Sequence, residues 1–327
     1  MIGAGSWGTT VASLAALTVP TTLWARRSDL ASAINQSREN REYMPGHRLP
    51  DLLEATADLQ LAVRNADALI IAVPSHGFRA VFKQMADEIT PDIPIISLTK
   101  GIEQGTLATM TEVVASEAPD HDPSRMGVLT GPNLASEIAD NQPTAAVIAM
   151  QDLATARSVQ DVLMCPTFRV YTNDDVTGCE MGGALKNVMA IAAGMSDGLG
   201  FGDNSRATLI TRALAELTRL GVILGGRPET FAGLAGMGDL IATCSSTNSR
   251  NHRVGEGLAQ GKSLDEVVAE MKMVAEGIKT TRSVLDLAVR AEVEMPIAEH
   301  VGQVLYDGVH QRDAVLSLMT REARSEQ

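Results

Sequence analysis

The chain opens on MIGAGSWGTT, in which Gly3, Gly5 and Gly8 form a G-x-G-x-x-G pattern. This spacing is typical of the turn between the first strand of a doubly wound sheet and a helix whose N-terminus faces a dinucleotide pyrophosphate. A structural turn without a ligand would also fit, because glycine is common in this chain. Residues 9–17 read as a helix leaving the turn and the apolar run TTLWA follows, which favours the dinucleotide interpretation.

Met1 and Ile2 precede this turn, where the first and central strand of such a sheet is normally complete. We expect these two residues to belong to that strand. The sequence does not decide whether the short start is native or a misplaced start site. A few apolar residues added upstream should add ladder hydrogen bonds and buried apolar area, and so raise the melting temperature.

Short apolar runs alternate with helical stretches through the first half of the chain. The runs are rich in β-branched or aliphatic residues, as buried parallel strands are, and cover residues 21–25, 68–73, 94–98, 126–130 and 145–150. This alternation predicts an α/β fold with a Rossmann-type doubly wound sheet. We expect that dinucleotide-binding domain to occupy residues 1–175.

After Thr172 the pattern becomes helical. Helical spacing covers residues 203–224, 278–291, 297–306 and 314–323, and Ser263 and Glu266 form a capping box at the start of a further helix. Because no Gly/Ser linker separates the two halves, we expect a directly packed, all-α substrate and catalytic domain over residues 176–327. The apolar content of this half suggests a homodimer.

Charge, cysteine content and hydropathy argue against nucleic-acid binding, disulfides, a zinc site and membrane insertion. The 327 residues carry a formal net charge of −13, which disfavours binding to nucleic acid. The three cysteines, Cys165, Cys179 and Cys244, form no C-x-x-C pair, so neither a disulfide framework nor a zinc site is indicated. We found no signal peptide and no run of about 18 apolar residues, and therefore expect a cytoplasmic protein without membrane insertion.

The end of the second strand bears on the choice of cofactor. An NAD-selective site usually places an acidic residue there for the ribose 2′-hydroxyl, whereas this chain has Ala25-Arg26-Arg27. Two guanidinium groups suit a 2′-phosphate, which makes NADPH plausible. Arginines facing solvent before a helix are the alternative, and the sequence leaves NADP(H) and NAD(H) both open.

Two stretches of the second half contain candidate catalytic side chains. In GGALKNVMAIAAG, the helical neighbours of Lys186 are small, which predicts a hollow for a ligand above its ammonium; they are Gly182, Gly183, Ala190 and Ala193. The alternative is a lysine that extends from a buried helix to water. In GLAGMGDLIATC, Asp239 could pair with that ammonium or, equally, cap a helix.

A third stretch, TNSRNHRVGEG, offers hydrogen-bond donors at the start of a helix. Ser249, Arg250 and Asn251 there would suit a phosphate group, although a polar loop is the alternative. In the first half, Lys100 follows one strand in SLTKGIE. The stretch TGPNLASE places Gly131, Asn133 and Ala135 after another strand, so both stretches should face the crevice beside the glycine turn.

Together these motifs resemble those of the bacterial NAD(P)-dependent glycerol-3-phosphate dehydrogenases. The resemblance rests on GAGSWGT, PSHGFR, TKGIE, GPNLASE, GGALKNVMAIAAGMSDGLGFGDN, GLAGMGDL, SRNHRVGE, VAEGIKT and EMPI, which occur in this order over essentially the whole chain. It implies reversible reduction of dihydroxyacetone phosphate to sn-glycerol 3-phosphate, which feeds phospholipid synthesis. Asn133 departs from the family pattern, because many members carry Ser or Thr there.

The resemblance also implies roles for residues. Lys186 would be the catalytic proton donor and acceptor. The implied substrate contacts are Lys100, Gly131, Asn133, Lys186, Asp239, Ser249, Arg250 and Asn251. The implied cofactor contacts are Ser6, Trp7, Arg26, Lys100, Ala135, Arg250, Val274 and Glu276, in addition to Gly3, Gly5, Gly8 and Arg27 from the motifs above.

The chemistry of these residues agrees with a carbonyl reduction. A protonated Lys186 can stabilise negative charge on the carbonyl oxygen and deliver a proton, so no metal is required. Two other functions stay open at this point. A β-hydroxyacid dehydrogenase would share the two-domain plan but act on a carboxylate substrate, and a redox-sensing protein would bind NADPH without turnover.

Overall fold

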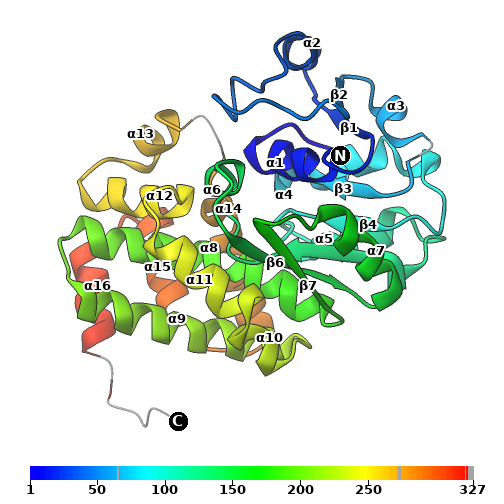
Figure 1. Ribbon diagram of the computed structural model, residues 1–327. Helices are drawn as coiled ribbons and strands as arrows, with labels where there is room; N and C mark the ends of the chain where they lie inside the picture. Colours follow the sequence, from blue (N-terminus) through cyan, green and yellow to red (C-terminus); the bar gives the residue numbers. More distant parts are fainter. Residues whose placement is uncertain (65, 272–273, 321, 323–327) are drawn as a thin grey trace.

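The computed structural model describes residues 1–64, 66–271, 274–320 and 322 (Figure 1). The strands are β1 (Thr21–Trp24), β2 (Leu53–Thr56), β3 (Leu69–Ile71), β4 (Ile95–Ser97), β5 (Met126–Thr130), β6 (Thr144–Met150) and β7 (Phe168–Asn173). The helices among them are α1 (Ser6–Ala15), α2 (Ser28–Ser37), α3 (Leu59–Val63), α4 (Ser75–Lys83), α5 (Met110–Glu117), α6 (Ala135–Ala139) and α7 (Leu153–Leu163), with 3₁₀ turns η1 (Ala86–Glu88) and η2 (Pro123–Arg125).

The strands form one α/β sheet in the order β2, β1, β3, β4, β5, β6, β7. Ile2 joins β1 to β3, because it bridges Trp24 on one side and Ile71 on the other, in parallel with both. Its N–H donates to Ile70 O at 2.8 Å, and its carbonyl accepts from Ala72 N at 2.7 Å. The start of the chain therefore lies in the centre of the sheet, as the glycine pattern predicts.

One strand prediction needs correction, and two strands were missed. The run at residues 145–150 is a strand, β6, but it is antiparallel to β5, with Val128 opposite Ala149. The link over residues 131–143 contains only the five-residue α6, whereas a parallel crossover usually carries a full helix across one face of the sheet. Strands β2 and β7 were not predicted, because exposed residues alternate with buried ones along both and neither forms a continuous apolar run.

Helices cover both faces of the sheet. On one face α1 and α7 pack into a core that includes Val11 and Leu163, and on the other α4 and α5 contribute Phe78, Phe82 and Val114. Helix α1 begins at Ser6 and not at residue 9. Gly5 has the extended backbone of an N-cap residue, so the helix starts directly after it. The carboxyl end of β3 lies against the glycine turn before α1, because a Cβ on Gly3 would lie 2.6 Å from Ala72 O. The segments after β3 and β4 contact the helical half through Ser75 and Lys100, which bond to Glu276 and Asp239.

From residue 176 onward the described chain is helical. The helices are α8 (Val176–Gly198), α9 (Asp203–Ile223), α10 (Pro228–Ala232), α11 (Asp239–Ser245), α12 (Arg250–Ala259), α13 (Leu264–Ala269), α14 (Glu276–Arg290), α15 (Pro296–Tyr306) and α16 (Gln311–Met319), with a π-helical turn η3 (Leu234–Gly238). The predicted capping box of Ser263 and Glu266 is present. Of the stretch predicted over 314–323, residues 321 and 323 lie outside the described residues.

Helix α8 is the axis of this half. It is buried almost throughout, contacts β5 and β6, and is surrounded by α9, α11, α12, α14 and α15 (Figure 1). Its position brings the middle of α8 to the edge of the sheet where the loops after β4 and β5 end. Across the described residues, no helix combines the length and apolar character that a membrane span requires.

Candidate functional site

The three glycines of the turn have different physical roles. Gly3 has φ +114°, and a Cβ there would lie 2.6 Å from Ala72 O; a Cβ on Gly8 would lie 2.0 Å from Gly3 O. These two positions therefore require glycine for the backbone turn and for close packing of α1. In contrast, no described atom comes within 4 Å of a Cβ built on Gly5. Gly5 thus borders open space in front of α1.

This open space suits a dinucleotide. Gly5 is the N-cap of α1, and no side chain of the described residues caps the helix, so its N–H groups and positive dipole end face the space. Trp7 Nε1 is buried without a hydrogen-bond partner among the described residues. An anion at the helix end and a polar ligand beside the indole would satisfy both groups. The residues present therefore fit the predicted cofactor.

The two arginines after β1 differ in their surroundings. Arg27 forms ion pairs with Glu42 and, at 3.8 Å, with Asp29. Arg26 is exposed, and its side chain makes no hydrogen bond or ion pair with any described residue. Of the two, Arg26 could therefore reach a 2′-phosphate without breaking an existing ion pair.

Lys186, Lys100 and Asp239 come together at the sheet edge. Lys186 Nζ lies 2.6 Å from Asp239 Oδ1, which confirms the predicted pairing, and Lys100 Nζ lies 2.6 Å from Asp239 Oδ2. Lys100 Nζ also donates to Gly131 O at 2.9 Å. Lys186 and Asp239 are 6% and 1% exposed, so this is a buried cluster of two cations and one anion.

Burial and charge perturb the pKa values of this cluster. Burial lowers the pKa of Lys100 to about 8; the Asp239 carboxylate opposes this shift and the Lys186 ammonium adds to it. Burial alone would raise the pKa of Asp239, but the two ammonium groups outweigh it and hold that pKa below its usual value. With both lysines protonated, the cluster carries one net positive charge, which suits an anionic substrate.

Thr243 is a further member of the cluster that sequence analysis did not identify. Its Oγ1 accepts a hydrogen bond from Lys186 Nζ at 2.6 Å and donates to Asp239 O, also at 2.6 Å. Because the hydroxyl proton is directed to the Asp239 carbonyl, an oxygen lone pair faces the ammonium. The i, i+4 spacing of Asp239 and Thr243 in DLIAT was the available sequence signal.

The small residues around Lys186 do not leave the hollow predicted above. A Cβ on Gly182 would lie 2.6 Å from Ala235 O in η3, and one on Gly183 would lie 3.0 Å from Thr130 Oγ1. Ala190 and Ala193 are also fully buried. The small side chains instead allow η3, β5 and the aliphatic part of Lys100 to pack closely against α8, which holds the charged cluster in place.

The stretch with Ser249, Arg250 and Asn251 forms the start of α12, as predicted. Ser249 is the N-cap, and its Oγ accepts from His252 N at 3.3 Å. Arg250 Nη1 donates to Val274 O at 2.5 Å. Burial lowers the pKa of Arg250, and the nearby Glu276 opposes this. Arg250 and two predicted cofactor contacts, Val274 and Glu276, are thus brought together.

A chain of buried amides connects this helix to the lysine cluster. Asn251 Nδ2 donates to Asn187 Oδ1 at 2.9 Å, and Asn187 Nδ2 donates to Lys100 O at 2.9 Å. Asn251 Oδ1 in turn accepts from Gly277 N at 2.9 Å. Asn187, to which sequence analysis gave no role, therefore links Lys100, α8, α12 and α14.

Glu276 spans the two halves of the chain. Its carboxylate accepts from Ser75 N at 3.1 Å and from Ser75 Oγ at 2.5 Å, where α4 begins after β3. The same carboxylate lies beside Gly101. The predicted cofactor contact Glu276 is therefore located at the carboxyl ends of the strands, in the same region as the glycine turn.

The loop after β5 contains an unpaired amide. The Oδ1 and Nδ2 atoms of Asn133 are both buried without a hydrogen-bond partner among the described residues. Gly131, at φ +118°, directs its carbonyl to Lys100, and Ala135 begins α6. An unsatisfied buried amide is costly, so Asn133 fits a position that a polar ligand completes.

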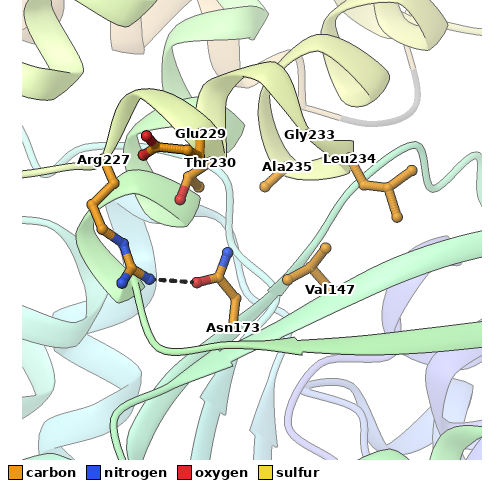
Figure 2. A pocket seen from close by; sticks show the side chains of 8 residues that line it. All are labelled: Val147, Asn173, Arg227, Glu229, Thr230, Gly233, Leu234 and Ala235. Carbon is orange, nitrogen blue, oxygen red and sulfur yellow. Dashed lines mark hydrogen bonds between the residues drawn. The ribbon is translucent and has the colours of Figure 1, made fainter.

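A separate hollow of about 360 Å³ opens beside α10 (Figure 2). Its lining combines the sheet edge with α10 and η3: Val147, Asn173, Arg227, Glu229, Thr230, Gly233, Leu234 and Ala235. Figure 2 shows Arg227 next to Asn173, to which it donates at 3.0 Å. None of the predicted site residues lines it.

No group of three or more His, Cys, Asp or Glu side chains placed for a metal ion occurs in the described part of the chain.

Comparison with known families identifies the chain. The model for the N-terminus of NAD-dependent glycerol-3-phosphate dehydrogenase matches residues 1–156, and the model for its C-terminus matches residues 175–316. The chain belongs to the NAD-dependent glycerol-3-phosphate dehydrogenase family. The resemblance drawn from the sequence motifs is thereby confirmed.

Individual relatives agree with this membership. A glycerol-3-phosphate dehydrogenase [NAD(P)+] of Sphingopyxis alaskensis is 53% identical over 93% of this chain and 90% of its own length. One from Geobacter sulfurreducens is 49% identical over 100% of this chain and 98% of its own length. The crystal structure of the Coxiella burnetii glycerol-3-phosphate dehydrogenase superposes with a TM-score of 0.93 at 38% identity, covering 98% of each chain.

Proposed function

We propose that this chain reversibly reduces dihydroxyacetone phosphate to sn-glycerol 3-phosphate with NADH or NADPH. The buried Lys186 ammonium, held at 2.6 Å by both Asp239 and Thr243, is the observation that carries the proposal. An ammonium has three donors, and these two residues are its partners within the described chain, so one donor remains for a substrate oxygen. Such a donor stabilises negative charge on a carbonyl oxygen and supplies its proton.

Lys186 transfers the proton to and from the substrate oxygen. A bound nicotinamide supplies the hydride for the carbonyl carbon, or accepts it in the oxidation. In the reduction Lys186 gives a proton to the oxygen, and in the oxidation the neutral amine takes the proton from the alcohol. Asp239 and Thr243 hold the amine in one position in both directions.

The phosphate of the substrate would bind at the N-terminus of α12. There the helix dipole, the guanidinium of Arg250 and the polar side chains of Ser249 and Asn251 suit a dianion. Lys100 supplies a second positive charge, and the unpaired amide of Asn133 suits a substrate hydroxyl. The full set of proposed substrate contacts is Lys100, Gly131, Asn133, Lys186, Asp239, Ser249, Arg250 and Asn251.

The cofactor would lie along the carboxyl ends of the strands. Its pyrophosphate is assigned to the open space at Gly5, and Arg26 is assigned to the ribose 2′-position. The proposed contacts are Gly3, Gly5, Ser6, Trp7, Gly8, Arg26, Arg27, Lys100, Ala135, Arg250, Val274 and Glu276. If Arg26 selects for the 2′-phosphate, Arg26→Ala should raise the KM for NADPH and leave that for NADH nearly unchanged.

The division of labour between the halves is part of this proposal. We assign dinucleotide binding to residues 1–175 and catalysis to residues 176–327. In support, the last described strand ends at Asn173, α8 begins at Val176, and the C-terminal family model begins at residue 175.

A cytoplasmic homodimer that supplies glycerophospholipid synthesis is the biological setting we propose. Exposed apolar side chains on the helical half support self-association, among them Val289, Leu316 and Met319. Light scattering coupled to size-exclusion chromatography tests the dimer: a monomer mass at micromolar concentration would refute it.

The decisive assay follows oxidation of NADH and NADPH with dihydroxyacetone phosphate. We expect turnover with this substrate and none with 2-hydroxy acids or 3-hydroxy acids in the reverse direction. Turnover of hydroxyacids instead would identify a different dehydrogenase, and binding of NADPH without any turnover would refute an enzymatic function.

A further inference from the structure

Two side chains outside the site described above, the buried His252 and the partly buried Asp197, join the helices that carry it. His252 Nε2 lies 2.8 Å from Asp197 Oδ2, and His252 is 2% exposed. Asp197 stands on α8 about three helical turns after Lys186. His252 lies in the first turn of α12, directly after Arg250 and Asn251. The pair therefore connects the helix of the proton donor to the helix that starts the phosphate site.

The charges and protons of this pair are defined by its surroundings. The other oxygen of Asp197, Oδ1, accepts from Arg206 Nη2 at 3.0 Å and from Arg206 Nε at 3.2 Å, which balances the carboxylate charge. His252 Nδ1 is buried with no partner among the described residues. A proton on Nδ1 would be an unsatisfied buried donor, so the tautomer with its proton on Nε2, donated to Asp197, is favoured.

The backbones of the two helices also touch at His252. A Cβ added to Gly194 of α8 would lie 1.9 Å from His252 O, and one added to Gly255 of α12 would lie 2.0 Å from Ile191 O. At this separation neither helix can approach the other more closely. The Asp197–His252 hydrogen bond then opposes separation, while the glycine contact opposes approach.

His252 is consequently fixed at three points. Its N–H donates to Ser249 Oγ, its carbonyl contacts Gly194, and its ring donates to Asp197. These contacts leave residues 249–251, the phosphate turn, little freedom relative to α8.

We propose that Asp197 and His252 are positioning residues for the substrate: they fix the phosphate turn at the distance from the Lys186 ammonium that a triose phosphate spans. This inference rests on the proposed function, because it assigns the phosphate to Arg250 and its neighbours. Neither side chain touches the reacting atoms. Loss of the pair should therefore weaken binding of the substrate through its phosphate and leave proton transfer by Lys186 intact.

A double-mutant cycle tests this on the full-length chain with NADH and dihydroxyacetone phosphate. His252→Phe should lower kcat/KM about tenfold, mainly by raising KM. Coupling free energies between residues in one hydrogen-bond network correspond to a change of about this size. In the Arg250→Ala background the same substitution should cause no further loss, since the side chain it positions is gone. His252→Gln, whose amide can donate to Asp197, should recover most of the activity.

Controls separate positioning from general stability. His300→Phe replaces another buried histidine of the helical half, which is 9% exposed and donates from Nδ1 to Pro296 O. It should leave the KM for dihydroxyacetone phosphate unchanged. Should His252→Phe fail to fold, Asp197→Ala serves in the same cycle, because it removes the acceptor of the His252 Nε2–H.

The outcomes are distinct. An equal loss from His252→Phe with and without Arg250, or an equal loss for unphosphorylated dihydroxyacetone and its phosphate, would overturn the positioning role. A loss that disappears in the Arg250→Ala background supports it. Absence of turnover by the wild-type chain would instead refute the proposed function, which the same assay measures first.

Discussion

Replacement of Asp239 by Asn removes one charge from a cluster in which a single carboxylate contacts two ammonium groups. The asparagine side chain would keep the size of the aspartate, but one of the two lysines would then face an amide. Both Lys186 and Lys100 lie 2.6 Å from the carboxylate, and Asp239 is 1% exposed, so water cannot replace the lost charge. We therefore expect a large loss of stability from this near-isosteric change.

The magnitude follows from the burial of the pair. Removing one partner of a buried ion pair costs about 3–5 kcal/mol in free energy of unfolding, because an uncompensated charge remains. For a chain of this length unfolding as one unit, that corresponds to a drop in melting temperature of roughly 4–7 °C. Turnover should fall as well, since Lys186 loses the group that orients it.

The deficit should depend on pH in a defined direction. The folded-state pKa of Lys100 is about 8, below its ordinary value of 10.5, and Asp239 keeps it from falling further. In Asp239→Asn the pKa of Lys100 falls further. A protonated Lys100 therefore destabilises the folded variant more than it destabilises the folded wild type. As pH rises through about 8 the wild-type Lys100 also loses its proton, and its share of the deficit disappears. The deficit should be largest near neutral pH and smaller at about pH 9.5.

Thermal unfolding of both proteins between about pH 6.5 and 9.5 tests this reasoning. Glu42→Gln is the matched control, because it breaks the exposed Arg27–Glu42 ion pair and should change the melting temperature far less. If Asp239→Asn unfolds at the wild-type temperature, or if its deficit grows with pH, the description of a buried two-cation cluster is wrong.

Four further predictions concern single substitutions. Lys186→Ala should reduce kcat by about 10²–10⁴ with little change in the dissociation constant of NADH, as measured by fluorescence titration. Arg250→Ala should raise the KM for dihydroxyacetone phosphate more than it lowers kcat; an unchanged KM would count against the phosphate turn. Gly5→Ala should keep the wild-type melting temperature and weaken NADH binding, whereas Gly8→Ala should lower the melting temperature, because its Cβ would lie 2.0 Å from a carbonyl oxygen. Burial raises the pKa of Glu216 from 4.5 to about 7, so the stability from its protonated form is lost as pH rises over that interval. Glu216→Gln should consequently raise the free energy of unfolding by up to about 3 kcal/mol at pH 8 and by much less at pH 5, measured by urea denaturation.

The parts of the fold that depend on neighbouring residues could be predicted from the sequence. The glycine turn, the capping box of Ser263 and Glu266 and the start of α12 at Arg250 are set by local backbone and hydrogen-bond requirements. The direction of β6 could not be predicted from its apolar run, because a buried strand has the same composition in either direction. It depends on the short helix in the link before it and on pairing with β7.

The site could also be predicted only in part, because some of its contacts depend on how distant segments pack. Pairing of Lys186 with Asp239 follows from the chemistry of the two groups, but the sharing of that carboxylate with Lys100 depends on how α8 meets the sheet. The small residues near Lys186 were interpreted as a hollow, because the sequence does not show that η3 packs against them. The Asp197–His252 pair has no local signature, since its members lie 55 residues apart.

The central claim is that the Lys186 ammonium faces the carbonyl oxygen of a triose phosphate whose phosphate lies at Arg250. A crystal structure of the chain with NADH and dihydroxyacetone phosphate, or a non-reducible analogue of it, measures this directly. We predict Lys186 Nζ within hydrogen-bond distance of the ligand oxygen while it retains Asp239 and Thr243. A phosphate bound away from the start of α12, or an amine directed away from the ligand, would contradict the account.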